Sequence, residues 1–160
     1  MPITELEDGA GQPVRIFLVE DNEGDVFLLS MALDQARFSH SLTVFRDGAD
    51  AMTFLRKSSA GTEVLPDLVL LDLNMPRVDG TTLIEMFRAE PALCNIPVIL
   101  LSSSRSPDDS ARARQFSKCI FVVKPSDLSS YMGIGHLARD FWIQSREPPS
   151  GNALDAAGAT

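Results

Sequence analysis

Four places along the chain join the end of a short apolar run to a side chain that can do chemistry. Glu20 and Asp21 follow the first run, and Asp72 ends another. Ser102 and Lys124 each follow one of the later runs. Gathered at one site, three carboxylates would repel one another unless a cation joined them, and Mg²⁺ prefers such oxygen ligands. The set therefore predicts a Mg²⁺-dependent phosphoryl transfer with an aspartate as the nucleophile.

Each residue has a distinct role in that chemistry. Asp72 would attack phosphorus and form an acyl phosphate. Mg²⁺ and the Lys124 ammonium would offset charge on the phosphoryl oxygens, and the Ser102 hydroxyl would donate a hydrogen bond to one of them. Taken singly, each has a plainer interpretation, because an acidic pair can mark a helix start, an Asp can cap a turn and a Lys-Pro pair can be a solvated loop. The four together, in this order, favour one shared site.

Short apolar runs alternate with helical patterns five times along the chain. Several runs are almost entirely apolar, as expected for parallel strands covered on both faces. The alternation predicts an α/β fold with a flavodoxin-like, doubly wound, five-stranded parallel sheet ordered 2-1-3-4-5 and five helices. In that order the first, third, fourth and fifth strands are adjacent, so their carboxyl ends would bring the four places together. The expected strands are Val14–Val19, Leu42–Phe45, Leu68–Leu73, Val98–Leu101 and Ile120–Val123, and the expected helices are Asp25–Ala36, Ala49–Arg56, Thr82–Arg88, Pro107–Phe116 and Leu128–Ile143.

The composition limits the classes of partner. The net charge is −8, which is the wrong sign for binding nucleic acid or an anionic membrane. No apolar run approaches the roughly 18 residues that a membrane helix needs, so we expect a cytoplasmic protein. Cys94 and Cys119 lack metal-ligand spacing and are expected to be thiols. We expect a flexible tail over residues 1–13, one folded domain over 14–143 and a flexible tail or arm over 144–160.

The segments FLVEDNEGD, LVLLDLNMPRVDG, PVILLSSS and FVVKP closely resemble the receiver domain of two-component response regulators. The resemblance covers about residues 14–143. It implies that a histidine kinase phosphorylates the protein with Mg²⁺ present and that output passes through contact with other proteins or phosphorelay. The site residues that it implies are Asp72 as phosphate acceptor, Asp21 as a direct Mg²⁺ ligand, Glu20 acting through water, Asn74 as a metal ligand through its backbone carbonyl, Ser102 and Phe121 as the switch pair, and Lys124 as the counter-ion of the phosphate.

Within this family, VEDNEGDVFLLSMAL, DLNMPRVDG and ARDFW are similar to the small regulators paired with bacterial phytochromes. That similarity implies a bacteriophytochrome as the kinase. It also implies a homodimer formed through the fourth helix, the fifth strand, the fifth helix and the C-terminal segment. The last helix carries more apolar residues than one sheet-facing stripe requires, which agrees with a dimer. The alternative is that Phe141 and Trp142 fold back over the domain's own core.

Three positions depart from the usual receiver pattern. Ser102 replaces the commoner Thr, and Phe121 replaces Tyr. The stretch FSKCIF lacks the Gly-Ala that usually precedes the fifth strand. This last departure makes the end of the fourth helix the least certain boundary in the predicted fold.

Two other functions fit parts of the pattern. An aspartyl-phosphate hydrolase of the haloacid dehalogenase type also has a nucleophilic Asp at a strand end, but it needs a second Asp two positions later. Here that position is Asn74, whose amide cannot deliver a proton, so we expect a protein that is not an enzyme. The other alternative is an unphosphorylated adaptor that keeps only the fold. The presence of all the site residues argues against it.

Overall fold

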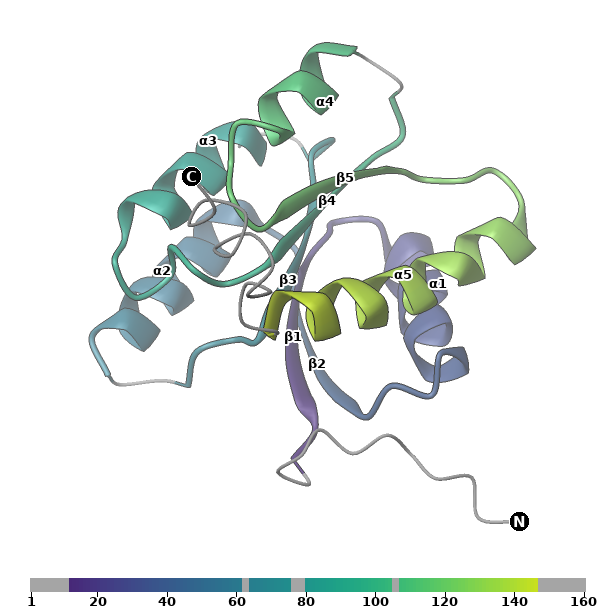
Figure 1. Cartoon of the computed structure of the whole chain (residues 1–160), viewed down its shortest axis with the longest axis horizontal. Helices are drawn as coiled ribbons and strands as arrows, with labels where there is room; N and C mark the ends of the chain where they lie inside the picture. The colour runs from purple at the N-terminus through teal and green to yellow at the C-terminus, as the bar shows by residue number, and fades with distance from the viewer. Residues whose placement is uncertain (1–11, 62–63, 76–79, 105–106, 147–160) are drawn as a thin grey trace, which may run out of the picture.

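A parallel sheet of five strands, in the order β2-β1-β3-β4-β5, forms the centre of the computed structural model (Figure 1). The structure describes residues 12–61, 64–75, 80–104 and 107–146. The order and the α/β class are as predicted from the sequence. The strands are β1 (Val14–Val19), β2 (His40–Phe45), β3 (Leu68–Asp72), β4 (Val98–Ser102) and β5 (Cys119–Val123).

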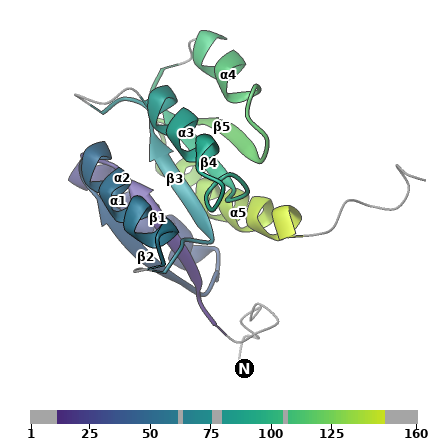
Figure 2. The ribbon, with the colours of Figure 1, turned by 90° about the vertical axis from the view of Figure 1, so that its left-hand side faces the viewer.

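Helices cover both faces of the sheet. The chain forms α1 (Glu23–Gln35), α2 (Gly48–Ser59), α3 (Gly80–Ala89), α4 (Pro107–Ala113) and α5 (Leu128–Arg146). α1 and α5 lie together on one face, while α2 and α3 lie on the other (Figure 1). Figure 2 shows α4 at one end of the molecule, next to β5. The described helices include none with the length and hydropathy that crossing a membrane requires.

Alternation along the strands divides the core into two layers. Every residue of β3 and β4 is buried, as expected for central strands covered on both faces. Leu68, Leu70, Ile99 and Leu101 belong to the layer beneath α1 and α5. The residues between them belong to the layer beneath α2 and α3. Side chains along a strand alternate between the two faces of the sheet. The alternation within each strand therefore determines towards which face the side chain at its carboxyl end points.

Several predicted boundaries are wrong by a few residues. α1 begins at Glu23 rather than Asp25 because Asn22 caps it, accepting a hydrogen bond from the Asp25 backbone N–H. β2 begins two residues earlier than expected, and α5 continues three residues further, to Arg146. A serine directly before Pro107 suits the capping position of α4, but this residue, Ser106, lies outside the described residues.

α4 ends at Ala113 rather than at Phe116, and a turn follows that the side chain of Arg88 holds. Its guanidinium donates to the backbone carbonyls of Ser117 and Lys118, at 2.9 and 3.1 Å. Lys118 has a φ of 50°, a left-handed conformation that costs a non-glycine residue about 1 kcal/mol or more. The residue before β5 thus adopts the conformation that glycine favours, at the place where the usual Gly-Ala is missing.

A glycine lets α1 and α5 approach closely. A Cβ added at Gly135 of α5 would lie 1.9 Å from the backbone oxygen of Ala32 in α1. At Gly133, by contrast, an added Cβ would meet nothing within 4 Å. Gly135 is therefore required by packing, whereas Gly133 is not, although both lie in the interior of a helix.

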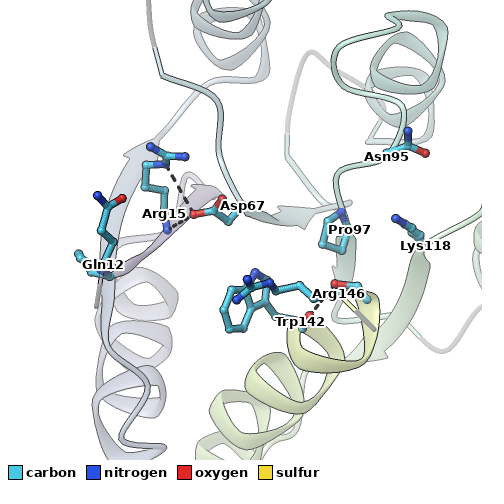
Figure 3. A pocket seen from close by; sticks show the side chains of 10 residues that line it. Gln12, Arg15, Asp67, Asn95, Pro97, Lys118, Trp142 and Arg146 are labelled. Carbon is cyan, nitrogen blue, oxygen red and sulfur yellow. Dashed lines mark hydrogen bonds and ion pairs between the residues drawn. The ribbon is translucent and has the colours of Figure 1, made fainter. Parts of the chain in front are cut away.

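Trp142 belongs to the domain's own core. Its ring lies 5.5 Å from that of Phe38, and it is buried in the layer beneath α1 and α5. One edge of it lines a cavity of about 330 Å³ at the end of the sheet away from the strands' carboxyl termini (Figure 3), and the Arg146 guanidinium stacks over its ring at 4.6 Å. For Trp142 the alternative interpretation is therefore confirmed, since the side chain folds back over the core.

Candidate functional site

The carboxyl ends of β1, β3 and β5 surround a cavity of about 490 Å³ that contains most of the predicted site residues. Oxygens of Glu20, Asp21 and Asp72 lie within 4.8 Å of one another. Glu20 and Asp72 are buried, whereas Asp21 is exposed. The three carboxylates predicted to share a site therefore do so, and one of them opens to solvent, from which an ion can enter.

The sheet alternation sends the predicted residues to two sides. Glu20 and Asp72 directly follow Val19 and Leu71 of the α2/α3 layer, and Lys124 is two positions beyond Val122, which packs against the α1/α5 layer. These three side chains therefore turn towards α1 and α5. Ser102 is two positions beyond Leu100, which belongs to the opposite layer, and Leu100 pairs in register with Phe121. The charged side chains of the site thus point to one face of the sheet, and the Ser102 hydroxyl points to the other.

Lys124 is surrounded by carboxylates. Its Nζ lies 2.9 Å from Glu20 Oε2, 3.1 Å from Asp25 Oδ2 and 3.5 Å from Asp72 Oδ2. Burial alone would lower the pKa of Lys124, but its hydrogen bond to Glu20 and the charges of Asp72 and Glu20 outweigh that effect and raise the pKa. The ammonium is therefore charged at neutral pH and is held directly beside Asp72.

Glu20 is a buried carboxyl in a negative environment. Desolvation by burial raises the pKa of Glu20 to about 7, against the lowering effect of its hydrogen bond with Lys124. Its other oxygen accepts a hydrogen bond from the Asn22 backbone N–H at 3.1 Å. The neighbouring Asp72 raises the pKa of Glu20 further, by a smaller amount than burial does, and a bound cation would offset this repulsion between the two carboxylates.

The donors suit a magnesium ion. Hard carboxylate oxygens with one exposed member leave room for the water ligands that Mg²⁺ keeps. Asp21 is the exposed member, and its role as a direct ligand stays a prediction. The role of the Asn74 backbone carbonyl stays a prediction, although Asn74 does line the cavity.

Asn74 connects Asp72 to Ser102. Its backbone N–H donates to Asp72 Oδ1 at 2.9 Å, and its side-chain amide donates to the Ser103 hydroxyl at 3.0 Å. The Ser102 hydroxyl donates to Asn74 Oδ1 at 3.1 Å and accepts from the Ser104 N–H at 3.0 Å. Ser102 is fully buried, and Phe121 is half-buried against the α2/α3 layer.

Two residues of the site were missed from the sequence. Asp25 bonds Lys124 as described above, and Tyr131 of α5 donates from its hydroxyl to Asp25 Oδ1 at 2.9 Å. Asp25 had been interpreted only as the start of a helix. Tyr131 lies in the last predicted helix, whose surplus of apolar residues had been interpreted as a dimer surface. It is the only tyrosine in the chain, and a buried tyrosine hydroxyl usually has a hydrogen-bond partner.

Sequence comparison finds a matching family model and related proteins. The model of the response regulator receiver domain matches residues 16–133. The chain is 31% identical over 147 residues to the probable methanogenesis regulatory protein FilR2 of Methanothrix harundinacea, covering 92% of each chain. It is 30% identical over 146 residues to response regulator Rcp1 of Synechocystis, covering 91% of this chain and 99% of Rcp1.

Solved structures agree with the sequence relatives. The phosphorylated cyanobacterial phytochrome response regulator RcpA superposes with a TM-score of 0.75 at 35% identity, covering 86% of this chain and 99% of RcpA. The Mn²⁺-bound form of Rcp1 gives a TM-score of 0.73 at 31% identity, covering 86% of this chain and 100% of Rcp1.

Proposed function

The chain belongs to the response regulator receiver family, and on that premise we propose that Asp72 accepts a phosphoryl group from a sensor histidine kinase. The observation that carries this proposal is the position of Lys124, whose ammonium lies 3.5 Å from Asp72 Oδ2 at the floor of an open cavity. A fixed cation beside a buried carboxylate is what a transferred phosphoryl group needs.

The transfer makes one bond and breaks one. An oxygen of Asp72 attacks phosphorus while the bond from phosphorus to the kinase's histidine nitrogen breaks, and that nitrogen keeps the electron pair. Lys124 then balances charge on a phosphoryl oxygen. Asn74 holds Asp72 by its backbone N–H, which leaves the other oxygen of Asp72 for the attack. Its amide side chain offers no proton for hydrolysis, which supports a signalling role over a hydrolase.

We assign the metal to Glu20, Asp21 and Asp72, with the Asn74 backbone carbonyl as a further ligand. When bound, Mg²⁺ would supply positive charge to the oxygens of the transferred group. The Mn²⁺-bound form of Rcp1 supports a divalent cation at such a site.

The switch is assigned to Ser102 and Phe121. A phosphoryl group on Asp72 would draw the Ser102 hydroxyl away from Asn74, and the space left would admit Phe121. Ser102 and Phe121 lie on the same face of the sheet, which α3 and α4 also cover, and this shared position supports the assignment. The change would then reach the surface formed by α4 and β5.

A bacteriophytochrome is the kinase that we propose, since RcpA is a phytochrome response regulator, and the cytoplasm is the compartment. We further propose a homodimer through α4, β5, α5 and the C-terminal segment. β5 is an edge strand whose five residues are all half-buried, and Leu137 and Ile143 of α5 are 39% and 37% exposed. These apolar groups, rather than Trp142, are the material available for a dimer contact.

Labelling with acetyl phosphate or a cognate kinase tests the phosphorylation site. Asp72→Asn should abolish labelling and keep the fold, as judged by circular dichroism. Asp34→Asn, which removes a carboxylate from an exposed position of α1, is the matched control and should label normally. Undiminished labelling of Asp72→Asn would show that another residue is the phosphoryl acceptor.

Sedimentation tests the dimer. Ile143→Asp should yield monomer at ~100 μM protein, well above micromolar dissociation constants. Phe27→Asp makes the same kind of change at a residue of α1 that is 64% exposed and should leave the assembly intact. A wild-type protein that stays monomeric at this concentration, with or without a phosphate mimic, would eliminate the dimer.

A further inference from the structure

Asp25 and Tyr131 form a chain of hydrogen bonds that ends at the ammonium beside Asp72. The Tyr131 hydroxyl donates to one oxygen of Asp25 at 2.9 Å, and the Lys124 ammonium donates to the other at 3.1 Å. Each oxygen of the Asp25 carboxylate is therefore assigned to one partner. The phosphoryl-transfer roles described above use neither residue.

The ammonium of Lys124 has three donors, and three carboxylates surround it. Glu20 and Asp25 are within hydrogen-bond distance, at 2.9 and 3.1 Å, whereas the 3.5 Å to Asp72 is longer than a good hydrogen bond. Two carboxylates thus hold the ammonium in place, and the direction towards Asp72 is left for a third partner. An oxygen of a phosphoryl group on Asp72 is the partner that this geometry suits.

Tyr131 is well placed to fix Asp25. Its side chain is only 4% exposed and belongs to the core layer beneath α1 and α5. Burial, followed by the hydrogen bond with Asp25, raises the pKa of Tyr131, so its hydroxyl keeps its proton at physiological pH and acts as the donor. The nearby contact of Gly135 with Ala32 holds α5 against α1, which fixes the helix that carries the tyrosine relative to the helix that carries the aspartate.

We propose that Asp25 and Tyr131 are positioning residues, which hold the Lys124 ammonium where it meets a phosphoryl group on Asp72. This inference rests on the proposed phosphorylation of Asp72. Without the hydroxyl, the Asp25 carboxylate is free to rotate, and Lys124 loses one of its two fixed partners. The cost falls on the phosphorylated state, in which the ammonium contributes most.

Beryllofluoride with Mg²⁺, which mimics a phosphoryl group on a carboxylate, is the probe that tests this. Tyr131→Phe removes only the hydroxyl and keeps the ring in the core. We expect it to weaken beryllofluoride binding about tenfold, because a hydrogen bond to a charged group typically contributes at least that much. In ¹⁹F NMR spectra of the complex, the resonance of the fluorine that contacts Lys124 should shift, and the other two should stay in place.

The Asp25→Asn variant tests whether Tyr131 acts through Asp25. There Tyr131→Phe should have no further effect on beryllofluoride affinity, since Tyr131 acts only through the Asp25 carboxylate. Ser145→Ala, which removes a different hydroxyl of α5, one that donates to the Trp142 carbonyl, should bind like the wild type. Circular dichroism confirms that each variant is folded.

Two results would overturn the inference. The first is a Tyr131→Phe variant with wild-type affinity and an unchanged ¹⁹F spectrum. The second is a loss of affinity that is equally large in the wild-type and Asp25→Asn backgrounds. A wild-type protein that takes neither beryllofluoride nor phosphate would instead contradict the proposed phosphorylation itself, so the two failures are distinguishable.

Discussion

The Ser102 hydroxyl donates a hydrogen bond to the side-chain carbonyl of Asn74 at 3.1 Å, although the two residues are 28 positions apart. This bond turns the proposed switch hydroxyl towards Asn74. A phosphoryl group on Asp72 must compete with Asn74 for the same proton. The unphosphorylated protein therefore has a defined partner for its switch, and activation exchanges that partner for another.

Replacing the switch hydroxyl separates phosphorylation from response. Ser102→Ala should still be labelled by acetyl phosphate, because Asp72 and Lys124 are unchanged. It should lose the phosphate-dependent change in self-association or partner binding, measured by sedimentation with and without beryllofluoride. Ser103→Ala removes the neighbouring hydroxyl, which accepts a hydrogen bond from the Asn74 side-chain amide, and should respond normally. A normal response from Ser102→Ala would show that Ser102 is not the switch.

Metal binding should depend unequally on the two adjacent carboxylates. Asp21→Ala should slow labelling at millimolar Mg²⁺ more than Glu20→Ala, because Asp21 is the exposed ligand and Glu20 is shared with Lys124. Mg²⁺ should also raise the melting temperature of the wild type, since it binds the folded state and relieves carboxylate repulsion. Equal labelling rates in EDTA and in Mg²⁺ would contradict the metal assignment.

Glu20 makes stability depend on pH in the absence of metal. Burial raises its pKa from the ordinary 4.5 to about 7, so the folded state binds this proton more tightly than the unfolded state. The contribution to the free energy of unfolding is complete below pH 4.5 and is lost as the pH rises through about 7. Urea denaturation in EDTA at pH 5 and pH 8 should show a decline that is larger in the wild type than in Glu20→Gln. An identical decline in both proteins would remove Glu20 as its source.

The two glycines of α5 should respond in opposite directions to alanine. Gly135→Ala would place a methyl group against the Ala32 backbone oxygen, and such overpacking should cost about 3 kcal/mol or more. Gly133→Ala meets no obstacle and should stabilise the fold by about 1 kcal/mol, since alanine favours the helix. Urea denaturation of both variants measures the difference. A Gly135→Ala protein as stable as the wild type would show that α1 and α5 can separate at little cost.

The sheet order, the strand positions and the convergence of Glu20, Asp21, Asp72 and Lys124 were all predictable from the sequence. Apolar runs that end in polar residues fix where each strand stops, and parallel strands bring those ends to one edge. The pattern is local to each strand, so it is readable without knowing the contacts.

Features that depend on contacts between distant segments were not predictable. The bonds of Tyr131 to Asp25 and of Asp25 to Lys124 need the positions of α1, β5 and α5 together. The early end of α4 depends on the Arg88 side chain, which donates to carbonyls about 30 positions later. The place of Trp142 in the core could not be predicted either, because its ring partner Phe38 lies about a hundred positions earlier in the chain.

The contact between Ala32 and Gly135 has a consequence for how the protein is made. Its two residues are about a hundred positions apart, and contacts of such long sequence separation form slowly. During synthesis from the N-terminus, β1 and α1 leave the ribosome long before α5 exists to cover them. The part of α1 that α5 covers in the folded protein stays uncovered until α5 has emerged. We therefore expect chains truncated before α5 to aggregate or to need a chaperone. The final helix then has two roles, since it completes the core and also allows folding to finish.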